Sequence, residues 1–171
     1  IKSANSENEL KGLYSAMVRR IGSKDDSLVI ALTKAKDEAK ERIRSAFSSS
    51  SIPLPKKRIV INLAPADIPK ENSSFDLAIA VSILQSAKLI KPTQEKTVFF
   101  GELGLDGSIK PVRGIIGKLM SAKKHGLLTA YIPSANREQA SLVDGIDIYA
   151  FNTLEEVYLH LSGSKPKTAE N

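Results

Sequence analysis

The chain has 171 residues, of which 42% are hydrophobic, and it carries a formal net charge of +6 and no cysteine. Its length and apolar content suffice for one well-packed domain. The absence of cysteine excludes disulfide bonds, thiolate metal sites and a cysteine nucleophile. No apolar run reaches the roughly 18 residues that a membrane-spanning helix requires. The basic surplus is compatible with a nucleic-acid partner. However, the basic residues are spread along the chain and aromatic residues make up only 5% of it, which favours ordinary solvated surface charges.

The first third of the chain predicts two short strands and a helix. The runs LYSAMVRR and SLVIALT have strand character, and GSKDD between them is typical of a hairpin turn. In KAKDEAKERIRSAF, apolar or small residues recur at every fourth position, at Ala35, Ala39, Ile43 and Phe47. This spacing predicts an amphipathic helix, which the serines and prolines of SSSSIPLPKK bring to an end.

The middle third predicts a strand, a buried helix and a hairpin. RIVINLAP is rich in β-branched residues and stops at a proline. FDLAIAVSILQSAKLI is apolar on nearly all sides, so we expect a helix that is buried all round. KTVFFGELGLDGSIKPVRG has the pattern of two strands, with Asp106 and Gly107 supplying the positive backbone angles of a tight turn. GIIGKLMSAKKHG is helical as far as Gly126, a residue suited to the C-terminal cap.

The last third alternates strands and helices. TAYIP and DIYAF predict strands, and SANREQASLV predicts a short helix that begins at a serine cap. NTLEEVYLHL predicts a final helix, capped by Asn152 or Thr153, with two glutamates suited to its dipole. Strands that alternate with helices indicate an α/β (α+β) fold, in which helices pack on a mixed β-sheet.

The two ends of the chain differ in composition from its middle. We expect a polar N-terminal extension over residues 1–12 and a single domain over 13–162. Residues 163–171 then form a linker, since SGSKPKTAEN has no periodic apolar residues. The polar start is no signal peptide. These features predict a cytoplasmic domain excised from a longer protein.

The sequence contains no motif for a nucleotide-binding loop, a metal site or a Ser-His-Asp triad. GIIGKL lacks the spacing of a Walker A phosphate loop, and Leu119 offers no hydroxyl to magnesium. His125 and His160 have no ligand partner at a suitable spacing, so we predict neither a metal site nor a Ser-His-Asp triad. His125, which precedes Gly126, fits an interaction with the end of a helix.

The stretch PKENSSFDLAIAVSIL presents two serines at the start of a predicted helix. Ser73, with Asp76 three residues later, has the Ser-x-x-Asp spacing of a capping box. Alternatively, Ser74 is a nucleophile placed where unpaired N–H groups stabilise an oxyanion. Its base would be a lysine kept neutral by burial, and Lys118 lies in an apolar run that fits this role. We adopt the capping interpretation and keep the dyad as the alternative.

Three stretches together resemble one protein family. RIVINLAPADIPKENSSFDLAIAVSIL, VFFGELGLDGSIKPVRGI and YIPSANREQASLVDGIDIYAFNTLEEV are similar to the N-terminal domain of ComM/YifB proteins. These are bacterial AAA+ proteins related to the magnesium chelatase ATPase subunit. The resemblance extends over about residues 39–160. It implies a Lon-protease-like fold with a ribosomal-protein-like βαβ core.

The resemblance also implies a role in DNA uptake and recombination. ATP and Mg²⁺ would bind in an AAA+ domain outside this chain, so no cofactor is expected here. The implied partners are that AAA+ domain, further copies of the chain and DNA, with no membrane. The domain would help to assemble a ring or to guide DNA. The basic residues that are candidates for contacting DNA are Lys56, Lys57, Arg58, Lys110, Arg113, Lys123 and Lys124.

The similarity to Lon assigns its Ser–Lys dyad to Ser74 and Lys118. The chain departs from the Lon pattern after the serine, where Lon has small residues and this chain has Phe75 and Asp76. It departs again before the Gly-Glu pair, where Lon has a threonine and Phe100 offers no hydroxyl. We therefore expect a non-enzymatic accessory domain. A Ser–Lys peptidase and a purely structural oligomerisation module are the alternatives.

Overall fold

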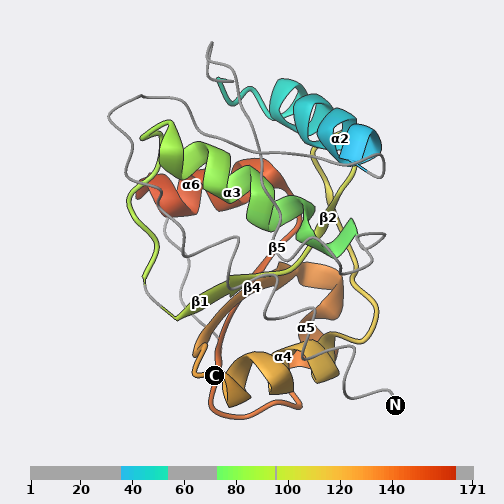
Figure 1. The fold of residues 1–171 in the computed structure, drawn as a ribbon, viewed down its shortest axis with the longest axis vertical. Helices are drawn as coiled ribbons and strands as arrows, with labels where there is room; N and C mark the ends of the chain where they lie inside the picture. The colour runs from blue at the N-terminus through green and yellow to red at the C-terminus, as the bar shows by residue number, and fades with distance from the viewer. Residues whose placement is uncertain (1–35, 54–72, 95, 165–171) are drawn as a thin grey trace.

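The computed structural model describes residues 36–53, 73–94 and 96–164 (Figure 1). The predicted hairpin formed by LYSAMVRR and SLVIALT and the predicted strand RIVINLAP lie outside these ranges. So do three of the basic candidates, Lys56, Lys57 and Arg58. The predicted domain limits therefore stay predictions.

A parallel sheet of three strands forms the centre of the described fold, in the order β1-β4-β5. A second, antiparallel pair, β2-β3, lies beside it. The strands are β1 (Thr97–Phe99), β2 (Glu102–Leu103), β3 (Ile109–Lys110), β4 (Thr129–Pro133) and β5 (Asp147–Phe151). The fold is thus α/β with both parallel and antiparallel pairing, as the alternation of elements predicted, and the two kinds of pairing are divided between two small sheets.

Helices lie on both faces of the parallel sheet (Figure 1). Helices α3 and α6 contact each other on one face, and α4 and α5 contact each other on the other face. The helices are α2 (Lys36–Ser49), α3 (Asp76–Ser86), α4 (Ile115–Lys124), α5 (Arg137–Ala140) and α6 (Leu154–Ser162), with 3₁₀ turns η1 (Ser73–Phe75) and η2 (Ser134–Asn136). None of the helices in the described ranges is long and apolar enough to cross a bilayer.

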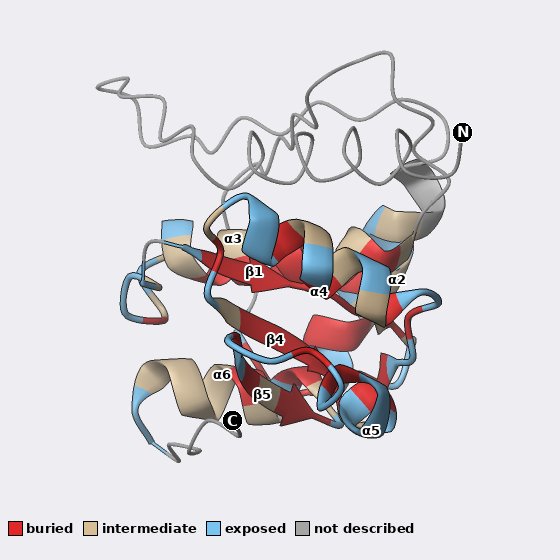
Figure 2. Ribbon diagram, turned by 90° about the horizontal axis from the view of Figure 1, so that it is seen from below, coloured by how far each residue is buried: buried red, intermediate tan, exposed pale blue. Residues whose placement is uncertain are grey.

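Helix α3 is the most deeply buried helix, as its apolar sequence predicted. Eight of its eleven residues are buried, because it packs against α2, α6 and strand β1. The strands of the parallel sheet are also mostly buried (Figure 2). Within α2, Ile43 and Phe47 are buried at the predicted spacing of four. Phe100 is also fully enclosed, with 1% of its surface exposed. Each such side chain stabilises the fold by roughly 1.5–3 kcal/mol.

The turn between β2 and β3 differs from the predicted one. Only Gly107 has a positive φ (+83°), and Asp106 is not among the residues with a positive φ. The Gly107 N–H donates to the Gly104 carbonyl at 3.0 Å, and the Gly104 N–H donates to the Ser108 carbonyl at 2.8 Å. This is a three-residue loop with glycine at its left-handed position. The Asp106 carboxylate instead accepts bonds from the Ser108 hydroxyl and N–H, which hold the pKa of Asp106 below its usual value.

Two of the predicted helix caps are confirmed, and the one after β4 is wrong. Helix α6 begins with Thr153, whose Oγ1 accepts the Glu156 N–H at 3.2 Å. Helix α4 is followed by Gly126 at a φ of +76°. The predicted serine cap after β4 does not form, because Pro133 is the cap residue of η2 and no side chain caps that turn through a hydrogen bond.

Candidate functional site

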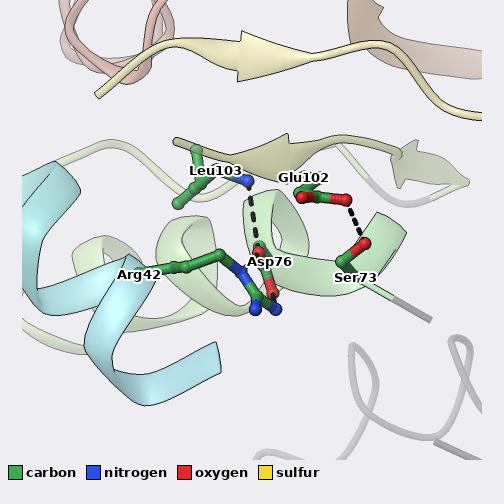
Figure 3. A network of polar contacts seen from close by, with 5 residues as sticks. All are labelled: Arg42, Ser73, Asp76, Glu102 and Leu103. Atoms are coloured by element: carbon green, nitrogen blue, oxygen red, sulfur yellow. Dashed lines mark hydrogen bonds and ion pairs between the residues drawn. The ribbon is translucent and has the colours of Figure 1, made fainter. Parts of the chain in front are cut away.

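The start of α3 carries the two serines on which the functional interpretation depends, and the predicted capping box is wrong there. Helix α3 begins at Asp76, its N-cap residue is Phe75, and no side-chain cap bond forms at that end. The 3₁₀ turn η1 precedes it and directs the Ser73 hydroxyl away from the helix. This hydroxyl donates to the carboxylate of Glu102 on β2 (Figure 3).

Asp76 does not bond back to Ser73 but joins three elements (Figure 3). Its carboxylate accepts two hydrogen bonds from Arg42 on α2, one from Nε at 2.7 Å and one from Nη2 at 3.1 Å. It also accepts the Leu103 N–H of β2 at 3.2 Å. Burial raises the pKa of Asp76 above its usual value, against the hydrogen bond and charge of Arg42, which lower it. The buried carboxylate is thus a structural junction between α2, α3 and β2.

Gly101 lies against the same turn through its backbone. Its N–H donates to the Ser74 carbonyl at 2.9 Å, and its carbonyl accepts the Leu77 N–H at 3.0 Å. A Cβ at Gly101 would lie 2.6 Å from Cγ2 of Ile109 and 3.2 Å from Cβ of Leu77. Only glycine permits this approach. The stretches SSFDL and GEL are therefore bonded to each other.

These bonds bear on the predicted dyad. Ser74 lies in η1 and is 3% exposed, and Lys118 lies on α4 and is half-buried. The N–H groups of Leu77 and Leu103, next to the serine turn, are already bonded to Gly101 and Asp76. They are thus not available to stabilise an oxyanion in this conformation. The pairing of Ser74 with Lys118 stays a prediction.

The described basic candidates lie in one stretch of the chain, on β3, on α4 and between these two elements. Residues 109–128 contain Lys110, Arg113, Lys118, Lys123 and Lys124 and no Asp or Glu. All of these except the half-buried Lys118 are exposed. The ammonium group of Lys123 also donates to the Asp144 carbonyl at 2.7 Å. The sequence analysis did not note that these twenty positions contain no acidic residue, although this can be read from the sequence alone.

Sequence reasoning missed Asn136, which is 4% exposed. Its Oδ1 accepts the Val112 N–H at 2.8 Å, and its Nδ2 donates to the Val112 carbonyl at 3.0 Å. Nδ2 also donates to the Gln139 side chain at 3.3 Å. No local pattern indicates this contact, because its two partners are 24 residues apart.

The histidines lie in structural contacts. The Nδ1 of His125 is 2.9 Å from the Ser121 carbonyl, at the end of α4 where an interaction was expected. The ring of His160 lies 5.1 Å from that of Tyr149, and its Nε2 is 3.2 Å from the Tyr131 hydroxyl. Burial, with a smaller effect of Tyr149, raises the pKa of Tyr131 to about 12.

The described residues contain no group of three or more His, Cys, Asp or Glu that could hold a metal ion.

A surface pocket of about 460 Å³ lies at α5 and the start of β5. Neither Ser74 nor Lys118 lines it. Its lining residues are Arg137, Ala140, Ser141, Val143, Asp144, Gly145, Ile146, Asp147 and Ile148. The pocket therefore adds nothing to the predicted dyad.

Comparison with known proteins places the chain in a family. Residues 18–136 match the family described as subunit ChlI of Mg-chelatase. The chain is 38% identical over 133 residues to competence protein ComM of Haemophilus influenzae, covering 77% of this chain and 26% of ComM. It is 34% identical over 127 residues to YifB of Escherichia coli, covering 74% and 25%. The chain thus spans about a quarter of the length of these relatives.

A further relative supports the fold. The chain is 37% identical over 95 residues to Lon protease 2 of Bacillus subtilis, covering 54% of this chain and 17% of that protein. This similarity and the observed α/β architecture agree with the expected Lon-protease-like fold. The motifs SSFDL and GEL, which both lie within residues 18–136, bond to each other at the start of α3. The chain belongs to the family of the Mg-chelatase subunit ChlI, as an N-terminal domain of the ComM/YifB type.

Proposed function

We propose that this chain is a non-catalytic accessory domain of a ComM/YifB-type AAA+ protein and that it guides DNA along a basic surface. The observation that carries the proposal is the acid-free segment 109–128 with its five Lys and Arg residues. ATP and Mg²⁺ belong, on this proposal, to the AAA+ part of the longer protein. That protein works in the cytoplasm, in DNA uptake and recombination, as a ring of several copies.

The basic surface suits contact with phosphates rather than with bases. Lys110 and Arg113 are exposed on either side of Pro111 and Val112, at the entrance to α4. In the described ranges every Phe and Tyr is buried or half-buried, so fully exposed rings for base stacking are absent there. Contacts through phosphates alone carry no sequence information. We therefore propose sequence-independent binding that depends mainly on charge.

The test is the salt dependence of binding to a labelled DNA duplex, measured by fluorescence anisotropy. We expect binding at low salt whose logarithm falls linearly with log salt, with a slope of about −0.9 per phosphate contact. The double variant Lys110→Glu/Arg113→Glu should weaken binding at least roughly tenfold and make the slope shallower by about two. Lys40→Glu/Lys91→Glu is the matched control, because it reverses two exposed charges on α2 and after α3.

Three results would contradict the DNA proposal. They are the absence of binding at low salt, an equal loss in the control variant, and wild-type affinity in Lys110→Glu/Arg113→Glu. Light scattering on the same samples gives the mass of the particles. Rings that bind no DNA would support the structural oligomerisation module instead.

The alternative function is that of a Ser–Lys peptidase, supported by the resemblance to Lon, which assigns the dyad to Ser74 and Lys118. We expect no labelling of the wild-type chain by a fluorophosphonate serine probe, because Ser74 is 3% exposed and the neighbouring N–H groups are already bonded. An active serine peptidase serves as the positive control. Labelling that disappears in both Ser74→Ala and Lys118→Ala would establish a working dyad and overturn the non-catalytic assignment.

A further inference from the structure

The loop between β3 and α4 is fixed by a side chain from another part of the chain. Asn136 pairs with both backbone polar groups of Val112, at 2.8 and 3.0 Å, in the way that a neighbouring strand would. Both residues are buried. Because water cannot compete for these buried hydrogen bonds, the Asn136 side chain holds the Val112 backbone in place. Val112 is therefore a rigid point in an otherwise exposed loop.

This rigid point lies directly beside Arg113. On the other side of Arg113, Gly114 takes a left-handed conformation (φ +67°), and its carbonyl accepts the Lys118 N–H at 3.1 Å as α4 begins. Lys110, at the far end of the loop, is held by the pairing of β3 with Glu102 on β2. The backbone positions of both exposed cations are therefore set before any ligand arrives.

We propose that Asn136 is a positioning residue for DNA binding and acts by holding the Arg113 backbone toward a phosphate. The inference rests on the proposed function, and it assigns a role to a buried residue that contacts no DNA itself. Preorganisation of this kind increases affinity because less conformational freedom is lost on binding. A purely structural Asn136 would stabilise the fold without any specific link to Arg113.

A double-mutant cycle on the full 171-residue chain separates the two roles. Affinity for the same DNA duplex and its salt slope are measured for wild type, Asn136→Ala, Arg113→Ala and the double variant. Arg113→Ala should weaken binding roughly fivefold and make the salt slope shallower by about one. Asn136→Ala should reproduce both changes and add almost nothing when Arg113 is already absent, because residues that act as a unit are not additive.

Ile83→Val is the control for stability, because it shortens a buried side chain of α3, on the opposite face of the parallel sheet from α4 (Figure 1), and lowers the midpoint of urea unfolding. It should leave both affinity and slope unchanged. Where Asn136→Ala does not fold, Asn136→Ser is used, since its shorter side chain keeps one polar group near Val112, and the same non-additivity is expected.

The outcomes distinguish the inference from the function on which it rests. If the wild-type chain binds no DNA, the proposed function fails. If it binds and Arg113→Ala weakens binding, but Asn136→Ala has wild-type affinity or adds its full effect to that of Arg113→Ala, the positioning role is wrong and the function stands. Agreement of the two single variants in affinity and slope, with little further loss in the double variant, supports the positioning role.

Discussion

Replacing Arg42 by methionine is expected to lower the free energy of unfolding by about 3 kcal/mol at pH 7, because it leaves the Asp76 carboxylate buried without its cation. The Asp76 side chain is only 2% exposed, so water cannot replace the guanidinium. Arg42 itself is 22% exposed, which places the expected loss at the lower end of that for a fully buried pair. Urea unfolding followed by circular dichroism measures it.

The penalty of Arg42→Met should depend on pH. Burial already raises the pKa of Asp76 above its usual value of 3.8, so the folded chain holds this proton more tightly than the unfolded chain does. The stability due to protonation is fully present below 3.8 and is lost as the pH rises through the raised pKa of the folded state. Removing Arg42 raises that pKa further. The difference between variant and wild type should therefore shrink as the pH is lowered.

Arg44→Met is the matched control, because Arg44 lies on the same helix and is exposed. It should change stability by no more than about 0.5 kcal/mol at either pH. Equal effects of the two substitutions would show that the Arg42–Asp76 pair does not hold α2 to α3. If the loss of unfolding free energy in Arg42→Met were the same at pH 7 and pH 4, the unpaired Asp76 carboxylate could not be its cause.

Replacing Gly101 by alanine is expected to destabilise the chain by about 2–3 kcal/mol, as overpacking of a tight interior does. The added methyl group would lie 2.6 Å from Cγ2 of Ile109 and 3.2 Å from Cβ of Leu77. Neither neighbour is free to move, because Ile109 is 6% exposed and Leu77 is fully buried. To relieve this contact, the backbone at residue 101, between β1 and β2, would have to move away from the start of α3 and lengthen its hydrogen bonds to Ser74 and Leu77.

Gly117→Ala provides a control with the opposite sign. Gly117 lies on the exposed side of α4, and a Cβ there meets nothing within 4 Å. Alanine should therefore stabilise the helix by about 0.5–1 kcal/mol through its higher helix propensity. Midpoints of urea unfolding should move in opposite directions for the two variants. A Gly101→Ala chain as stable as wild type would mean that the close approach at the serine turn is not needed.

Periodic elements could be predicted from the sequence because their signals are local. The apolar spacing of α2 and the all-round apolar sequence of α3 each depend on neighbours within a few residues. The caps at Thr153 and Gly126 were equally local. The motifs shared with the ComM/YifB family added a prediction of the whole fold, because the resemblance covers most of the domain.

The start of α3 could not be predicted because its bonds are not local. Ser73 and Asp76 have the spacing of a capping box, yet their partners lie 29 and 34 residues away, at Glu102 and Arg42. A pattern of neighbouring residues cannot reveal that a side chain bonds to a group far away in the sequence instead of to the helix it precedes. The bond between Asn136 and Val112 escaped prediction for the same reason. Polar residues with distant partners are where interpretation from sequence reaches its limit.

The bonding between SSFDL and GEL also restricts how this domain can change over time. Introducing the small residues that Lon carries after its serine means replacing Asp76, which removes the acceptor shared by Arg42 and the Leu103 N–H. No single substitution restores that balance, so each intermediate sequence on such a path would be less stable than its ancestor. A Lon-like sequence after Ser74 would therefore need compensating changes elsewhere in the junction between α2, α3 and β2. The connectivity of these polar groups thus makes the sequence after Ser74 resistant to single substitutions.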